Sequence, residues 1–378
     1  MYPALKQLES KGFWRCQHPA LFFCVLFALL ASGASAVGTP AQTPPYKIGV
    51  LYWSMNIPGQ VAMREGLEAE ASAINVRAQA AGTRGVELLA RVAGEGNEGI
   101  ERQIEQMSAL VEEDIDLLIV QPTDNAALVP PLKAANSAGI PVIAYDQYIS
   151  GGELAAYLTS DNYQAGYLNG EYIAHHFPDS HAIRLILVEY PHVSSTVERV
   201  NGLLDALHDR GQHYEILKTY IAVEPESGRV AGQSILADYP AKSTVDVVFA
   251  VNDGGGLAVS EVLAGAKRSE IFMATIDGDP RSVEQIQKGE GMIRIDSAQF
   301  CGPLGAEAMK TAYRVLAGEK VDRHILIPVY PVTAETVSQY RGWKGPIPDG
   351  FTKPWPSSAS EWKPEPKALP RAEALHEP

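Results

Sequence analysis

Residues 116–147 read DLLIVQPTDNAALVPPLKAANSAGIPVIAYDQ, and this stretch decides the fold class. Two short apolar runs, 117–120 and 142–144, flank a segment with helix signals. The polar triplet at 123–125 is typical of a helix start, and Gly139 is typical of a helix end. The order predicts a strand, a helix and a second strand parallel to the first.

Two polar residues follow the second apolar run, Asp146 and Gln147. In open α/β sheets, ligands bind beyond the carboxyl ends of the strands. We therefore take Asp146 and Gln147 as candidate ligand contacts.

The same alternation of apolar runs and amphipathic helical segments continues through most of the chain. We expect one series of strands at 47–52, 86–92, 115–120 and 140–145, and a second at 183–189, 214–221, 245–250 and 271–276. A further strand, helix and strand are predicted at 292–295, 303–317 and 324–332. The pattern predicts an α/β protein with two similar doubly wound lobes.

The first 36 residues have the pattern of an export signal. Three basic residues precede an apolar run at 21–30, and Ala34-Ser35-Ala36 follows it. The run is about ten residues long, too short to span a bilayer. We expect cleavage near Ala36, a periplasmic protein without a membrane anchor, and Cys301 as its one remaining cysteine, so no internal disulfide.

The formal net charge is −14, and it becomes −16 without residues 1–36, which hold three basic residues and one acidic residue. Such a charge argues against nucleic acid or anionic membrane as partners.

Residues 94–99, GEGNEG, match a dinucleotide fingerprint as a string but follow the second predicted strand, so we expect no nucleotide cofactor. His175, His176 and His181 lack the further ligands of a metal site, and no metal is expected.

Several motifs occur in the order found in one known family. They are Asn56-Ile57-Pro58, Val120-Gln121-Pro122-Thr123-Asp124, Gly139 to Ile143 ending in Asp146, Ser160-Asp161-Asn162, Glu198 to Gly202, Val248 to Asp253, and Ile276-Asp277-Gly278. Over residues 46–333 the chain resembles the sugar-type periplasmic solute-binding proteins, the ribose-binding-protein-like group with the type I fold.

The resemblance implies two Rossmann-like lobes joined by a three-stranded hinge, with crossings near Ser160, Ser297 and Pro328. The implied N-terminal lobe comprises 46–159 and 300–327, and the implied C-terminal lobe comprises 160–299 and 328–344. Residues 345–378 contain eight prolines and no sustained periodicity. We interpret them as a tail that is either extended on the surface or disordered.

The resemblance also implies a site for a ligand with adjacent hydroxyl groups, which needs carboxylate and amide acceptors, Arg or amide donors and an aromatic face. Asp146 and Asp277 match the acceptors, and Arg199, Asn252 and Gln299 match the donors or bridging groups. The other candidates are Gln147, Asn56, Gln60, Trp53 and Tyr148.

The chain departs from the ribose-type pattern at four positions. Ile57 replaces an Asn, Gly59 and Gln60 replace two aromatic residues, and Gln147 replaces an Arg. The ligand therefore need not be ribose. Either Trp53 or Tyr148 is expected to supply the missing aromatic face, unless both are packing residues.

The sequence predicts a monomeric exported binding protein that captures a monosaccharide or related polyol by lobe closure and delivers it to an ABC importer. The two carboxylates are also compatible with a positively charged ligand. The alternative partner is a sensor histidine kinase, to which the protein would present its ligand state. A cytoplasmic repressor of the same core fold is disfavoured, because a leader occupies the place of its DNA-binding domain. No catalytic activity is expected.

Overall fold

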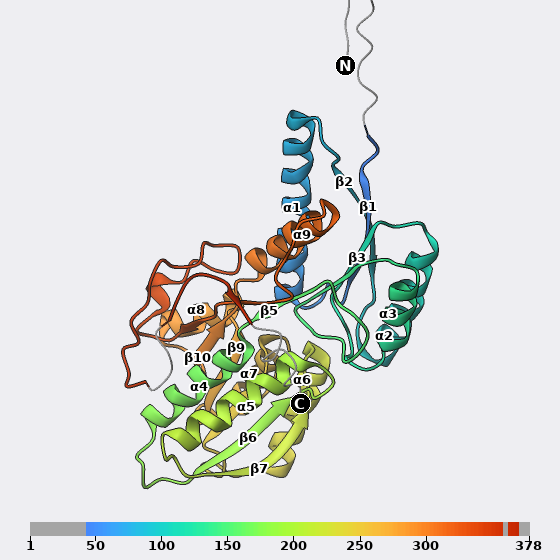
Figure 1. The fold of residues 1–378 in the computed structure, drawn as a ribbon. Helices are drawn as coiled ribbons and strands as arrows, with labels where there is room; N and C mark the ends of the chain where they lie inside the picture. Colours follow the sequence, from blue (N-terminus) through green and yellow to red (C-terminus); the bar gives the residue numbers. More distant parts are fainter. Residues whose placement is uncertain (1–42, 358–361, 370–378) are drawn as a thin grey trace, which may run out of the picture. The chain divides into compact units, whose positions relative to one another are not determined.

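The structure, a computed structural model, describes residues 43–357 and 362–369 (Figure 1). The predicted signal peptide lies outside the described residues. Within them, no helix combines the length and the apolar character needed to cross a membrane.

The first sheet has seven strands in the order β13-β11-β5-β4-β3-β1-β2. All neighbours are parallel except β11 and β13. Their bounds are β1 Tyr46–Tyr52, β2 Val86–Val92, β3 Leu117–Val120, β4 Val142–Tyr145, β5 Ala156–Ser160, β11 His324–Ile327 and β13 Lys367–Ala368. On one side lie α1 (Pro58–Ala81) and α9 (Cys301–Leu316), and on the other lie α2 (Gly96–Glu112) and α3 (Val129–Ser137), as Figure 1 shows. We call this sheet and its helices the first lobe.

The stretch 116–147 forms the predicted strand, helix and strand, but its helix begins later than expected. All four residues of β3 and all four of β4 are buried, as parallel strands covered on both faces require. The Asp124 carboxylate accepts hydrogen bonds from the amides of Ala126 and Ala127, 2.8 and 2.7 Å away, and so forms a turn. Helix α3 starts after that turn, with a proline in its first turn.

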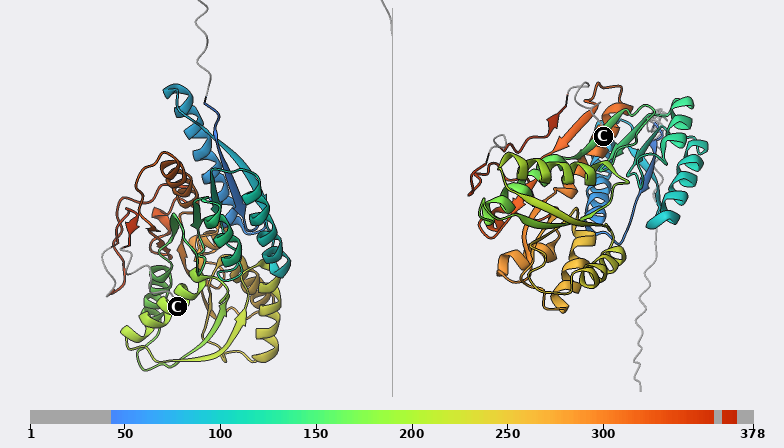
Figure 2. Two further views of the ribbon diagram at one scale, coloured as in Figure 1. Left: turned by 45° about the vertical axis from the view of Figure 1, so that its right-hand side comes forward. Right: turned by 90° about the horizontal axis from the view of Figure 1, so that it is seen from below.

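The second sheet has six strands in the order β12-β10-β9-β8-β6-β7, parallel except for the pair β10 and β12. The strands are β6 Ile183–Glu189, β7 Tyr214–Ile221, β8 Val247–Ala250, β9 Phe272–Asp277, β10 Ile293–Ala298 and β12 Tyr330–Val332. The helices are α4 Asn162–His176, α5 Ser194–Asp209, α6 Pro225–Asp238, α7 Asp253–Gly265 and α8 Pro280–Lys288, with a 3-10 turn η1 at Val337–Gln339. Helix α4 packs on α5, and α6 packs on α7 (Figure 2). This is the second lobe.

The chain passes from one sheet to the other four times, after β5, after β10, after β11 and, on the way to β13, after β12. The first three are the hinge crossings, and they lie side by side. The Asp161 amide donates to the Ile327 carbonyl at 2.8 Å, and the Ser160 hydroxyl donates to Oε1 of Gln299 at 2.7 Å. Two doubly wound α/β lobes on a three-stranded hinge are the type I periplasmic binding protein fold, which confirms the predicted fold class. The residue limits of the two lobes stay a prediction. The assignment of β1 to β5 and β11 to the first sheet, and of β6 to β10 and β12 to the second, supports it.

The segment after residue 344 makes contacts that its composition did not predict. Trp355 and Trp362 are buried, and β13 pairs antiparallel with β11 at the edge of the first sheet. The proline-rich sequence gave no periodic pattern from which to predict these contacts, because each is made by a single aromatic side chain.

Candidate ligand site

A small cavity lies where the carboxyl ends of both sheets meet. It is lined by residues that follow strands and by residues in the first two turns of helices. They are Trp53, Ile57, Gly59, Gln60, Met63, Asp146, Gln147, Val193, Ser195, Thr196, Arg199, Val223, Asn252, Asp277 and Gln299. Both lobes contribute, so the cavity is an interlobe site at the position that strand ends predict.

The cavity measures about 30 Å³. This is room for about two water molecules, whereas pockets for small ligands usually measure roughly 300–1,000 Å³. In this arrangement the side chains nearly fill the site. A sugar-sized ligand therefore requires the lobes or the lining side chains to move apart.

Asp146, directly after β4, is 3% exposed and has a φ of 66°. The amide of Gln121 donates to its Oδ2 at 2.9 Å, and Oε1 of Gln121 accepts from the Trp53 backbone amide at 3.2 Å. Burial raises the pKa of Asp146, and the Gln121 hydrogen bond and the Arg199 charge oppose this rise. Gln121 thus fixes the first-lobe carboxylate relative to the loop that carries Trp53.

Asp277, the last residue of β9, is the matching carboxylate of the second lobe, and its φ is 134°. Its Oδ1 accepts hydrogen bonds from Nη1 of Arg199 at 3.2 Å and from Nε2 of Gln299 at 2.6 Å. These are the hydrogen bonds that the described residues make to its carboxylate, and both end on Oδ1. Burial raises the pKa of Asp277 to about 7, against the opposing effects of Arg199 and Gln299.

Arg199 reaches the cavity from α5 and is 3% exposed. Its Nε donates to Oδ1 of Asn162 at 2.9 Å, and its Nη1 also donates to the Val251 carbonyl at 2.7 Å. The guanidinium is therefore buried among acceptors and does not lie on the solvent-exposed surface of the helix. Gln299 in turn joins the site to the hinge, since it donates to Asp277 and accepts from Ser160.

Three further predicted residues line the cavity through side chains that also hold local structure. Asn252 caps α7 by accepting from the Gly255 amide, and it donates to the Val223 carbonyl. Gln60 accepts from the Ser54 amide at 2.9 Å. Gln147 accepts from the Ser195 hydroxyl at 2.6 Å, a direct hydrogen bond between the lobes.

The structure places Asn56 and Tyr148 outside the cavity lining. Asn56 is exposed in the loop after β1, where the backbone turns away before the proline at the start of α1. The ring of Tyr148 lies edge-on to Tyr157 at 5.2 Å, in the first lobe, and its backbone amide donates to Ser194. Of the two aromatic candidates, Trp53 is therefore the one that faces the cavity.

Sequence reasoning missed the lining residues of the α5 start and of the loop after β7, namely Val193, Ser195, Thr196 and Val223. His192 and Ser194 contact the first lobe at Asn125 and do not line the cavity. Trp53 packs with Tyr190, Val193 and Val223 in an apolar cluster that joins the lobes. A cluster made of single residues from separate loops has no periodic signal in the sequence.

Two further carboxyl groups, those of Asp253 and Asp296, are buried behind Asp277. The Ser282 hydroxyl lies within hydrogen-bond distance of both, and the Asp279 amide donates to Oδ2 of Asp253 at 2.7 Å. Oδ1 of Asp253 is buried without a hydrogen-bond partner among the described residues. Burial and the neighbouring carboxyls raise the pKa of Asp253, and burial raises the pKa of Asp296 to about 6.

We predict that Asp253→Asn makes stability less dependent on pH. A carboxyl whose pKa is raised by folding contributes stability below its unfolded pKa, and this contribution is lost as the pH rises through the folded value. The free energy of unfolding of the parent protein should therefore fall between pH 5 and pH 8. The variant should be more stable than the parent protein by about 1–2 kcal/mol at pH 8, because an amide does not titrate and the contribution of Asp253 to the pH dependence is removed.

Urea denaturation at pH 5 and pH 8 measures this difference. Asp246→Asn is the control, since Arg184 and His181 lower the pKa of Asp246 and place its titration below this window. Equal pH dependence in the parent protein and Asp253→Asn would contradict the prediction.

The fold and the interlobe site define a two-lobed binding protein, and comparison with known proteins identifies its family. The chain belongs to the periplasmic binding protein domain family, whose model matches residues 48–320. It is 26% identical over 291 residues to the ribose import binding protein of Escherichia coli, covering 77% of this chain and 90% of that protein.

Solved structures share the fold. A solute-binding protein of an ABC transporter from Mycobacterium smegmatis, with bound glycerol, is 26% identical with a TM-score of 0.66, covering 78% of this chain and 96% of that one. A counterpart from Bacillus halodurans with bound myo-inositol has a TM-score of 0.68 at 22% identity, covering 80% and 99%. The second likeness concerns the fold alone. The names of these relatives describe binding proteins of transport systems.

Proposed function

We propose that this protein captures a monosaccharide or a related polyol between its lobes and delivers it to an ABC importer. The observation that carries the proposal is the pair of buried carboxylates, Asp146 and Asp277, which approach one cavity from different lobes. Arg199 adds a buried cation beside them. A hydroxyl-bearing ligand both donates and accepts, so it suits such a mixed set.

The backbone at the two carboxylates supports a binding role. Both have a positive φ, which among the described non-glycine residues also occurs at Asp114, Ser243 and Lys267. Unusual backbone conformations persist where the surroundings hold them, and they cluster at functional sites. The carboxylates are thus aimed by the backbone before a ligand arrives, which lowers the entropic cost of binding.

The small cavity supports a mechanism of opening and closure. A ligand that bridges Asp146 and Asp277 gains more hydrogen bonds when the lobes are together, so it shifts the population toward the closed form. The three hinge crossings are the segments about which the lobes would rotate. The importer would then recognise a surface that only the closed form presents.

The relatives support uptake in the periplasm. The ribose import protein and the glycerol-bound protein belong by name to transport systems, so we do not carry the sensor-kinase alternative forward. The leader at residues 1–36 supports export, with cleavage near Ala36. One relative has bound glycerol and another is named for ribose, so the relatives do not fix which sugar or polyol this protein binds. Gln147 stands where ribose-type members have an Arg, so the ligand need not be ribose.

We predict that Asp146→Asn weakens ligand binding by about 30- to 1,000-fold. The exchange keeps the side-chain volume but replaces a charged acceptor by an amide, and loss of one partner of a buried charged hydrogen bond costs about 2–4 kcal/mol. The measurement is calorimetric titration with a panel of monosaccharides, polyols and small amines.

Asp116→Asn is the matched control, because Asp116 belongs to the same strand, helix and strand unit but precedes β3 at the opposite end of the sheet. It should bind like the parent protein. The proposal fails if no sugar or polyol in the panel binds the parent protein, or if Asp146→Asn binds as tightly as the parent does.

A further inference from the structure

The residues after β12 form a segment that contacts both lobes behind the ligand site. We call residues 340–357 and 362–369 the C-terminal strap. They lie beyond residue 320, where the match to the family model ends. The strap is therefore not covered by what the family likeness describes, and its role has to be argued from its own contacts.

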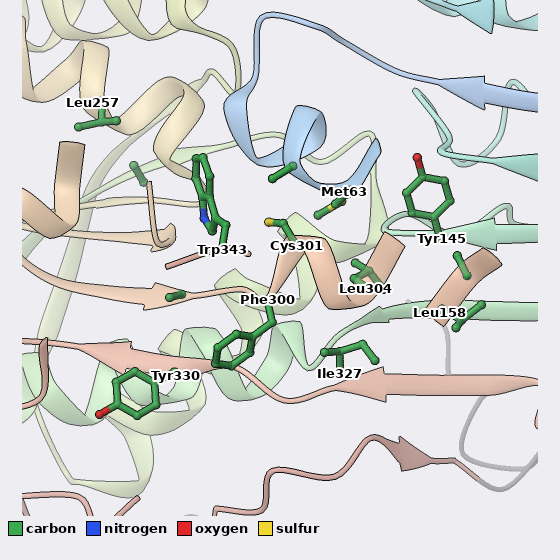
Figure 3. Packing of buried hydrophobic residues seen from close by; sticks show 14 of the residues in the cluster. Met63, Tyr145, Leu158, Leu257, Phe300, Cys301, Leu304, Ile327, Tyr330 and Trp343 are labelled. Carbon is green, nitrogen blue, oxygen red and sulfur yellow. The ribbon is translucent and has the colours of Figure 1, made fainter. Parts of the chain in front are cut away.

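Trp343 is the strap residue nearest to the site. Its indole Nε1 donates to the backbone carbonyl of Asp277 at 2.6 Å. A Cβ built at Gly59, a cavity-lining residue, would lie 3.9 Å from Cζ2 of Trp343 and 3.5 Å from Sγ of Cys301. Figure 3 shows Trp343 and Cys301 among the buried residues near Met63. Trp343 thus forms the layer directly behind the cavity wall.

The same part of the strap is bonded to the first lobe. The carbonyl of Trp343 accepts from the Gly302 amide, in the first turn of α9, at 3.1 Å. The ammonium of Lys344 lies 2.5 Å from Oε2 of Glu65 on α1. Trp343 therefore holds β9 of the second lobe and α9 of the first lobe at once, and a rotation that separates the two breaks one of these bonds.

The rest of the strap repeats this attachment to both lobes. Lys353 and Ser357 contact the buried carboxylate of Glu171 on α4, in the second lobe. Trp362 donates from its indole to the Val329 carbonyl, within the third hinge crossing, at 2.6 Å. Strand β13 then extends the sheet of the first lobe, and the Leu369 amide donates to the His324 carbonyl at 3.0 Å.

We propose that Trp343 is a positioning residue for the ligand site and that the C-terminal strap holds the lobes together behind it. The Asp277 carbonyl accepts from the Gln299 amide at 2.9 Å, and the Trp343 indole adds a second hydrogen bond that helps to hold the backbone there, where φ is 134°. The strap is part of a fourth chain crossing, from β12 to β13, and its contacts link the lobes beside the three hinge crossings. It favours the closed arrangement before ligand arrives, so less of the binding energy goes into closure. The ligand-affinity part rests on the proposed function, whereas the strap itself does not.

Trp343→Phe tests the proposal in the full-length protein, because it keeps a ring in the core and removes the indole N–H. Trp355→Phe is the matched control. Trp355 is also buried, but its indole nitrogen donates to no acceptor among the described residues, and its ring packs on Tyr172 of α4 and on Phe351 of the strap. Both variants remove one indole N–H, but only the N–H of Trp343 donates to the Asp277 carbonyl.

Two readouts are combined. The first is affinity for whichever panel sugar or polyol binds the parent protein best. The second is the interlobe distance without ligand, measured by electron paramagnetic resonance between spin labels on Val76→Cys of α1 and Val230→Cys of α6, both exposed positions. Trp343→Phe should weaken binding about five- to tenfold, as expected for one hydrogen bond, and shift the distance distribution. Trp355→Phe should change neither.

The proposal is overturned if Trp343→Phe leaves both readouts unchanged, or if Trp355→Phe changes them equally, which would indicate a general packing effect. If the parent protein binds nothing in the panel, the proposed function fails. In that case the interlobe distance still tests whether the strap holds the lobes together, because it is measured without ligand.

Discussion

Replacing Arg199 with methionine is expected to lower the free energy of unfolding by about 3–5 kcal/mol at pH 8, the usual cost of breaking a buried ion pair, since Asp277, with a pKa of about 7, is mostly ionised there in the parent protein. Methionine preserves most of the apolar part of the side chain. Asp277 stays buried, but of its two hydrogen bonds only the one from Gln299 remains. Asn162 and the Val251 carbonyl also lose their donor. Ligand binding should fall below detection, because the one buried cation of the cavity lining is removed.

The double variant Arg199→Met/Asp277→Asn separates charge from packing. Removing both charges eliminates the unpaired carboxylate, so the double variant should regain about 2 kcal/mol relative to Arg199→Met. Arg184→Met is the control in the same lobe. Arg184 pairs with Asp246 at 2.6 Å, but its side chain is 35% exposed, and its loss should cost about 1 kcal/mol or less.

Urea denaturation of the four proteins measures these differences. The interpretation of Arg199 as a buried structural and binding cation is wrong if the double variant is no more stable than Arg199→Met. It is equally wrong if Arg184→Met is as destabilised as Arg199→Met.

Replacing Gly166 with alanine is expected to destabilise the protein by about 3 kcal/mol, at the upper end for one extra methyl group in a packed core. Helices α4 and α5 meet at this residue, and a Cβ there would lie 1.9 Å from the carbonyl oxygen of Arg199. A backbone atom cannot rotate away, so α5 has to shift. Since α5 carries Arg199 into the cavity, ligand affinity should fall as well, by about tenfold or more.

Gly265→Ala is the matched control for this substitution. Gly265 is the last residue of α7, and a Cβ there would meet no atom within 4 Å. The variant should be as stable as the parent or more stable by up to about 1 kcal/mol, because alanine is the better helix former. Thermal unfolding and titration of both variants check this. Equal stability of the two would show that α4 and α5 have room to adjust.

Local patterns were sufficient to predict the fold class and several strand ends. The buried strands β3 and β4 are continuous apolar runs bounded by turn residues, so their carboxyl ends could be read directly. Asp146 and Gln147 follow from that pattern alone. Asp277, Arg199, Asn252 and Gln299 were predicted only through the ordered family motifs, because an Asp-Gly turn or an Arg on a helix has ordinary explanations.

The start of α3 shows how one local interaction overrode another. The triplet at 123–125 has the composition of a helix cap, but the Asp124 carboxylate closes a turn on the amides of Ala126 and Ala127. The helix then begins at Val129. Composition could not rank these two uses of the same carboxylate, because both satisfy its acceptors.

The two α/β lobes and the strand ends at which polar residues lie follow from local patterns, because periodicity and turn chemistry act over a few neighbouring residues. The folded arrangement was needed to show that Trp53 and not Tyr148 faces the cavity, that Ser195 meets Gln147 across the lobes, and that Trp343 supports Asp277 from the C-terminal strap. Each of these is a contact between single residues far apart in the chain. Such contacts depend on how the hinge brings the lobes together, which no local pattern records.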